Sequence, residues 1–171
     1  IGHAPLRETF AAALLETAGW RDFGVIADPL CGAGTLLIEA AQMAAQKSPA
    51  AGRAFAFEHW PSFKPRLWAR IVRETAGAAT AKIRLIGSDI SAAAVDLARR
   101  NATRGGVAGA IEFSVRDCLA FNAQGEAGAT GLIISNLPYG KRAFASSQDL
   151  HRFYREWGAH LRRRCRGSIW A

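Results

Sequence analysis

One short stretch, from Val25 to Ala40, constrains the fold of this 171-residue chain more than any other. A run of three apolar residues leads to Asp28, a turn with two glycines follows, and a helical pattern opens near Thr35. A strand, a Gly-rich turn and a helix in this order form a concavity at a helix N-terminus, where free N–H groups and the helix dipole point into the turn. The stretch therefore predicts a βα unit that suits a nucleotide-like ligand.

The spacing of the glycines separates two kinds of nucleotide. Gly32 and Gly34 match the first two positions of the dinucleotide fingerprint G-x-G-x-x-G, but Leu37 stands at the third. Without a phosphate to hold, the bare backbone can pack against an adenosine that carries an amino-acid tail, and Asp28 can accept from its ammonium group. S-adenosylmethionine fits that description. The alternative interpretation of this loop alone is a tight turn without a ligand.

Length and composition predict a globular protein with one core. The chain is 50% hydrophobic and carries both signs of charge. We find no signal pattern and no apolar run of membrane-spanning length, so we expect a cytoplasmic protein without membrane contact. Cys31, Cys118 and Cys165 are odd in number and far apart, which predicts buried thiols and no metal site. A net charge of +8 favours a polyanionic partner.

The chain alternates strand and helix patterns. Strands are expected over 24–29, 83–86, 111–115, 132–135 and 167–171. Helices are expected over 5–18, where Leu6, Phe10 and Leu14 form the apolar face, and over 35–46, 92–103 and 148–164. This alternation predicts a Rossmann-like α/β fold with a doubly wound, mostly parallel sheet and ligands at the carboxyl ends of its strands. The pattern stops in the fifth strand, so we expect a truncated sheet.

The periodicity changes between residues 47 and 81. An aromatic group stands here among prolines, before a short helix expected over 65–76, and consists of Phe55, Phe57, Trp60, Phe63 and Trp68. Such a group is either a base-stacking platform or the small core of an insertion, and burial frequencies favour the core. We therefore expect one domain over 1–171 that is interrupted by an insertion over 47–81.

Acidic side chains follow the second and third expected strands. Asp89 closely follows the second strand, at the carboxyl end where an acid in nucleoside-binding α/β folds accepts from the ribose hydroxyls. The insertion explains why it lies more than the usual ~20 residues beyond the glycines. Asp117 follows the third strand, and it either accepts from the adenine amino group or caps a turn. Both acids should lie at the same edge of the sheet as Asp28.

The fourth expected strand leads directly into Asn136-Leu137-Pro138-Tyr139. The residue before a proline is extended, so the Asn136 amide and the Leu137 carbonyl can face one way while Tyr139 offers an aromatic face. These groups can hold the exocyclic amine of a flipped purine. Methyl transfer to such a nitrogen depends on alignment and electrostatics more than on a strong base. In isolation, the same residues are also compatible with a turn that ends a strand.

Basic residues flank this segment. Lys141 and Arg142 follow it at once, and the helix expected over 148–164 exposes several arginines while burying an apolar face of Leu150, Phe153, Trp157 and Leu161. The exposed set consists of Arg152, Arg155, Arg162 and Arg163. These arginines either contact nucleic acid or form an ordinary solvated helix face.

With these motifs, the chain resembles the catalytic domain of the THUMP-associated RNA guanine-N2 methyltransferases. The likeness rests on 28–40, 87–90 and 136–140, with 2–7 and 57–60 in support. It implies a class I methyltransferase fold, S-adenosylmethionine as cofactor, and a guanosine of rRNA or tRNA as substrate. It assigns the cofactor contacts to Pro5, Leu6, Asp28, Cys31, Gly32, Gly34, Thr35, Asp89, Ile90, Asp117, Cys118 and Asn136. It assigns catalysis to Asn136, Leu137, Pro138 and Tyr139.

Some features depart from that family's pattern. Leu137 stands where the family usually has a second proline, and Asn-Leu-Pro-Tyr also resembles the RNA adenine-N6 dimethyltransferases. A second hypothesis is therefore methylation of adenine N6 in RNA or DNA, and a third is a catalytically silent RNA-binding module. We expect the family's N-terminal RNA-binding domain and the last strands of the sheet to be absent.

Overall fold

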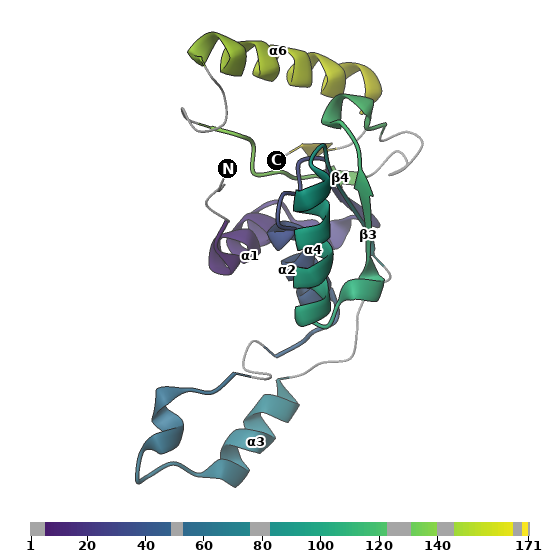
Figure 1. Cartoon of the computed structure of the whole chain (residues 1–171). Coiled ribbons are helices and arrows are strands. Elements are labelled where there is room, and N and C mark those ends of the chain that lie inside the picture. Colours follow the sequence, from purple (N-terminus) through teal and green to yellow (C-terminus); the bar gives the residue numbers. More distant parts are fainter. Residues whose placement is uncertain are drawn as a thin grey trace. The chain divides into compact units, whose positions relative to one another are not determined.

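A computed structural model describes residues 6–48, 53–75, 83–122, 131–139, 146–165 and 169–170. The chain forms two compact units (Figure 1). One consists of Ile1–Ala41 together with Ile83–Ala171, and the other of Gln42–Lys82. The first unit holds the sheet and all of the strand ends at which a ligand was expected.

Within the described residues, five parallel strands form one sheet in the order β3-β2-β1-β4-β5. Their bounds are Val25–Asp28 for β1, Arg84–Asp89 for β2, Ile111–Val115 for β3, Gly131–Ile133 for β4 and Ile169–Trp170 for β5. The chain builds outward from β1 to β3 and then resumes on the other side with β4, so the strand order reverses between β1 and β4. Open α/β sheets bind ligands at such a reversal. The predicted α/β fold with a parallel sheet is confirmed.

The described helices are α1 (Glu8–Thr17), α2 (Thr35–Ala44), α3 (Pro65–Glu74), α4 (Ala92–Arg104) and α6 (Ser147–Arg164). Within the first unit, α2 and α4 pack on one face of this sheet and α6 on the other, whereas α3 belongs to the second unit. The short 3-10 turns are η1 (Trp20–Asp22), η2 (Ala56–His59), η3 (Ala108–Ala110) and η4 (Cys118–Ala120). No described helix combines the length and the apolar character that a membrane span needs.

The face toward α2 and α4 is packed closely at Gly87 in β2. A Cβ atom at this position would lie 2.7 Å from Phe113 and 2.8 Å from Leu37 of α2. The strand continues through Gly87 to Asp89, whereas the sequence predicted that it ends at Ile86. The glycine is a site of close packing inside the strand and not a turn, which is one of the meanings that an interior glycine can have.

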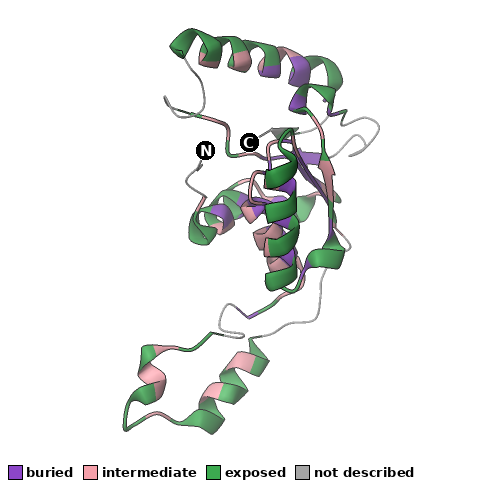
Figure 2. Ribbon diagram, viewed as in Figure 1, coloured by how far each residue is buried: buried purple, intermediate pink, exposed green. Residues whose placement is uncertain are grey.

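The opposite face is covered by α6. The core cluster between the sheet and α6 consists of Ala27, Ile86, Cys118, Phe121, Ile133, Trp157, Leu161 and Cys165. Trp157 and Leu161 are buried as predicted, while Phe153 is only partly buried. His160, which sequence analysis did not single out, is also buried and its Nε2 lies 2.6 Å from the Phe121 carbonyl oxygen. Figure 2 shows how burial concentrates on the strands and on the inner sides of these helices.

The buried stripe of α1 differs from the prediction. Phe10 and Leu14 are 60% and 46% exposed, whereas Ala11 and Leu15 are fully buried. Leu14 and Leu15 are adjacent apolar residues, so the helical period allows either face, and only packing selects one. The expected face of Leu6, Phe10 and Leu14 was therefore wrong by one residue.

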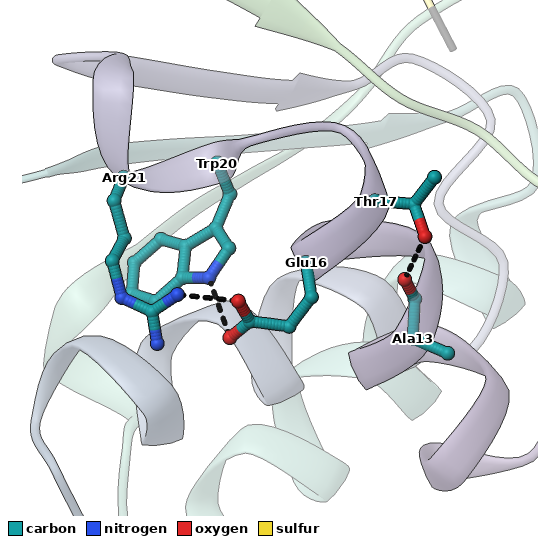
Figure 3. A network of polar contacts seen from close by, with 5 residues as sticks. All are labelled: Ala13, Glu16, Thr17, Trp20 and Arg21. Atoms are coloured by element: carbon teal, nitrogen blue, oxygen red, sulfur yellow. Dashed lines mark hydrogen bonds and ion pairs between the residues drawn. The ribbon is translucent and has the colours of Figure 1, made fainter.

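The end of α1 is fixed by polar contacts with η1 (Figure 3). Glu16 accepts a hydrogen bond from Trp20 Nε1 at 3.2 Å and forms an ion pair with Arg21. The Arg21 guanidinium lies over the Trp20 ring, 4.7 Å from its centroid. Gly19 adopts φ +66° at this point, so the predicted helix end at this glycine is confirmed.

The second unit is organised around the ring of Phe57. Its centroid lies 5.0 Å from that of Trp68, 5.3 Å from Phe55, 6.0 Å from Phe63 and 6.4 Å from Trp60. These mutual contacts agree with the small-core interpretation of the aromatic group. Its members are only partly buried, however, and Trp60 is 63% exposed.

Candidate active site

The turn after β1 owes its shape to two glycines with positive φ. Gly32 has φ +52° and Gly34 has φ +81°. A Cβ atom on Gly34 would lie 3.0 Å from the Ala98 Cβ and 3.2 Å from Phe113 Cζ, whereas one on Gly32 would meet nothing within 4 Å. Gly34 therefore lets α2 approach α4, and Gly32 leaves bare backbone facing open space.

A polar residue of α4 also holds this turn. Asn101 Nδ2 donates a hydrogen bond of 2.9 Å to the Ala33 carbonyl oxygen. Sequence analysis did not assign Asn101 a role. The sequence did contain a signal, which is an amide side chain near the end of a helix that otherwise has small residues on this side, such as Ala98 and Ala102. Both alanines are buried in the structure.

Asp89 lies at the end of β2 beside this turn. Its Oδ2 accepts from the Gly32 N–H at 3.0 Å, and its Oδ1 accepts from the Ser91 N–H at 2.9 Å. A carboxylate has about four acceptor sites, so each oxygen keeps capacity for one further donor. The half-buried carboxylate is thus fixed in orientation and still able to accept from a pair of hydroxyls.

Asp28 lies in a more buried environment than Asp89. It is 2% exposed, and its Oδ1 accepts from Ser135 Oγ at 2.6 Å and from the Leu30 N–H at 3.2 Å. Burial raises the pKa of this carboxyl to about 7, against the lowering effect of these two hydrogen bonds, and the charge of Asp89 raises it further. Its two hydrogen bonds link neighbouring segments of the chain, and the contact with a ligand ammonium stays a prediction.

The segment after β4 presents two side chains outward. Asn136 and Tyr139 are exposed, Tyr139 by 66%, while Leu137 packs against the core cluster under α6. Tyr154 of α6 donates a hydrogen bond of 2.7 Å to the Pro138 carbonyl oxygen. In the described part of the chain the Asn136 amide makes no hydrogen bond, so it is available to a ligand.

The other residues that the sequence predicted for the site lie in several separate elements. Ile90 is 70% exposed next to Asp89, and Thr35 begins α2. Asp117 caps η4 by accepting from the Leu119 N–H at 2.8 Å, which matches the capping alternative. Leu6 precedes α1 and is half-buried, whereas Pro5 lies outside the described residues, as do Lys141 and Arg142.

The cysteines are free and buried, as predicted. Burial, with the charges of Asp28 and Asp89, raises the pKa of the Cys31 thiol far above its usual range. Burial and the Asp117 charge raise the pKa of Cys118 to about 12. Both thiols are therefore neutral at physiological pH and suited to packing, and among the described residues no cluster of three metal-ligating side chains occurs.

Two open hollows lie elsewhere, between α6 and η4. Their volumes are about 480 Å³ and 430 Å³, and their linings share Leu119, His160 and Arg163. Neither lining contains a predicted cofactor or catalytic residue. The reversal of strand order, with Gly32 on one side and Asn136 on the other, is the better candidate, because ligand sites in this architecture follow topology.

The comparison with protein families gives a match over the whole chain. The model of the UPF0020 family, described as RMKL-like methyltransferase domain, matches residues 1–171. The ribosomal RNA large subunit methyltransferase K/L of Shewanella baltica (strain OS185) is 41% identical over 160 residues, which is 90% of this chain and 22% of that protein. The chain thus spans about a fifth of the length of the curated relatives that it matches.

Solved structures show the same fold. SMU.472, a candidate methyltransferase crystallised in complex with SAH, superposes with a TM-score of 0.85 at 29% identity and covers 99% of this chain and 44% of that one. A predicted N6-adenine-specific DNA methylase from Listeria monocytogenes superposes with a TM-score of 0.81 at 32% identity, over 99% of this chain and 43% of that one. The fold assignment therefore rests on both topology and superposition.

Proposed function

Because this chain belongs to the RMKL-like methyltransferase domain family, we propose that it transfers a methyl group from S-adenosylmethionine to the exocyclic N2 of a guanosine in ribosomal RNA. One observation carries the proposal. The Gly32–Gly34 turn and the exposed Asn136 amide follow the two strands, β1 and β4, between which the strand order reverses. A donor held at the first and an acceptor held at the second meet at one edge of the sheet.

On the donor side, the residues present fit an adenosine with an amino-acid tail. The free acceptor capacity of Asp89 suits the two ribose hydroxyls, and exposed Ile90 offers an apolar surface to the adenine. The open space at Gly32 lets a ligand approach the backbone. Asp117 follows β3 at the same edge of the sheet, where its carboxylate can accept from the adenine amino group. When bound, the cofactor supplies a methyl group on a positively charged sulfur.

On the acceptor side, the Asn136 amide oxygen and the Leu137 carbonyl accept from the two N–H groups of the exocyclic amine. This orientation turns the nitrogen lone pair toward the methyl group, and exposed Tyr139 stacks on the purine ring. As the N–C bond formed, the sulfur–methyl bond would break and S-adenosylhomocysteine would leave. The extra proton on the nitrogen would then pass to solvent at this exposed segment, so no strong base is needed. Alignment of donor and acceptor supplies most of the acceleration.

Two observations support RNA as the substrate, and two support methylation of adenine N6 instead. The net charge of +8 suits a polyanion, and the relative at 41% identity is named for ribosomal RNA. The Listeria structure is named for adenine N6 in DNA, and the Asn-Leu-Pro-Tyr segment is compatible with that chemistry. Methylation of adenine N6 is therefore the second candidate. We place the activity in the cytoplasm, where ribosomal RNA is available.

The deciding experiment identifies the methylated nucleoside. The protein that carries this chain is incubated with S-adenosylmethionine and either unmodified ribosomal RNA, tRNA or DNA, and the digested nucleosides are resolved by mass spectrometry. N2-methylguanosine from ribosomal RNA is the expected product. N6-methyladenosine from any polymer would support the rival, and the absence of any methylated nucleoside would favour a silent RNA-binding module.

Two variants separate the two halves of the site. Asp89→Ala should weaken cofactor binding by roughly 1–3 kcal/mol, because it leaves ribose hydroxyls and the Gly32 N–H unpaired. Asn136→Ala should leave cofactor affinity near normal and abolish transfer. Asp96→Ala is the matched control, since this exposed acid of α4 pairs, among the described residues, with Arg99 alone, at 3.2 Å. Full transfer by Asn136→Ala would refute the acceptor assignment.

A further inference from the structure

The segment that presents Asn136 and Tyr139 has no regular secondary structure of its own, since β4 ends at Ile133. Its position must therefore come from contacts with neighbouring elements. The Ile134 N–H donates to the Ala27 carbonyl oxygen at 2.9 Å, and the Leu137 side chain packs against the cluster under α6. Two further contacts are made by hydroxyl groups, one on each side of Asn136.

The first hydroxyl belongs to Ser135. Its Oγ donates to Asp28 Oδ1 at 2.6 Å, and the same oxygen accepts from the Leu30 N–H at 3.2 Å. Asp28 is 2% exposed, so this hydrogen bond is shielded from water, and few other donors reach the Asp28 carboxylate. One carboxylate oxygen thus connects the turn that follows β1 to the segment that follows β4.

The second hydroxyl belongs to Tyr154, in the first half of α6. It donates to the Pro138 carbonyl oxygen at 2.7 Å. Proline has no N–H with which to anchor itself, so its carbonyl is the polar backbone group through which this residue can be held. The two hydrogen bonds hold the segment on both sides of Asn136 and leave the side chains of Asn136 and Tyr139 exposed.

We propose that Ser135 and Tyr154 are positioning residues that clamp the acceptor segment, Ser135 by fixing it to the donor turn through Asp28 and Tyr154 by fixing it to α6. The inference rests on the proposed function. Neither hydroxyl touches the substrate. Their effect is on distance, because a displacement of about 1 Å between reacting atoms can lower a rate by about 10²-fold.

The first test compares Ser135→Ala with Ser88→Ala. Ser88 lies in β2 and Ser135 follows β4, the two strands that flank β1, and both serines are at least partly buried. The Ser88 hydroxyl, however, is buried without a hydrogen-bond partner in the described part of the chain. For Ser135→Ala we expect kcat for methyl transfer to fall about 10- to 100-fold, with cofactor affinity by calorimetry changed less than threefold. Ser88→Ala should keep the wild-type kcat, and Ser135→Thr, which retains the hydroxyl, should recover most of it.

A second readout does not depend on activity. Amide hydrogen exchange across residues 134–139 should accelerate in Ser135→Ala and in Tyr154→Phe, and should accelerate most in the double variant, while exchange in β2 stays unchanged. If Ser135→Ala fails to fold, Tyr154→Phe still tests the clamp, since it removes only a hydroxyl from a residue that is 36% exposed.

The outcomes separate the clamp from the proposed function. Wild-type protein that methylates no guanosine would overturn the function, whereas the exchange data would still decide the clamp. Unchanged exchange and unchanged kcat in both variants would overturn the clamp in an active enzyme. A loss of cofactor affinity as large as the loss of kcat would also overturn it, because it would show that Ser135 supports the donor turn alone.

Discussion

Gly32 and Gly34 occupy the same turn after β1, yet replacing each by alanine should have different consequences. Both residues have positive φ, at +52° and +81°. Their surroundings differ, because an added Cβ on Gly34 would press on Ala98 and Phe113, and one on Gly32 would enter open space. The pair therefore separates the role of the turn in folding from its role in binding.

The magnitudes follow from two costs. Left-handed backbone costs an alanine about 1–2 kcal/mol, and overpacking a close contact costs about 1–3 kcal/mol. Gly32→Ala bears only the first cost, whereas Gly34→Ala, with contacts of 3.0 Å and 3.2 Å, bears both. For a chain of this size each kcal/mol shifts Tm by roughly 2–4 °C, so Gly34→Ala should melt on the order of 10 °C below wild type and Gly32→Ala only a few degrees below it.

The assay combines melting with binding. Tm is measured by calorimetry, and the affinity for S-adenosylhomocysteine is measured on the folded protein at low temperature. Gly32→Ala should lose at least tenfold in affinity despite its smaller loss of stability, because its methyl group occupies the space in which the ligand approaches the backbone. Equal Tm losses in the two variants, or wild-type affinity in Gly32→Ala, would contradict this reasoning.

Two further predictions concern stability. Because burial raises the pKa of Asp28 to about 7 from an unfolded value near 4, the folded state holds a proton that the unfolded state has lost, and stability should fall by up to about 3 kcal/mol between pH 5 and pH 8. Denaturant titrations of Asp28→Asn should lack this dependence, and an identical slope in that variant would exclude Asp28 as its source. Gly87→Ala should cost about 1–3 kcal/mol through its 2.7 Å contact with Phe113, whereas Gly109→Ala, which meets nothing within 4 Å, should change stability by less than about 0.5 kcal/mol.

Local sequence signals were sufficient where a motif carries its own geometry. The strand, glycine turn and helix after Val25, the strand over 111–115 and the helix end at Gly19 are set by neighbours in the chain, so periodicity and glycine placement predicted them. The carboxyl-end position of Asp89 followed for the same reason. Its free acceptor capacity did not, since that depends on the Gly32 N–H, which is 57 residues away in the chain.

By itself, the sequence determined that this chain forms a parallel α/β sheet with its polar residues at one edge. Alternation of apolar runs and helical periods dictates that arrangement whatever the packing. Only the tertiary structure decided which face of α1 is buried, and that Asp28 is buried while Asp89 stays partly exposed. In the sequence, Asp28 and Asp89 both stand at the carboxyl end of a strand. In the structure, Asp28 is buried and accepts a hydrogen bond from the hydroxyl of Ser135, 107 residues away in the chain, and so connects two loops. Such long-range contacts leave no local signal, because they arise only when β1 and β4 become neighbours in the sheet.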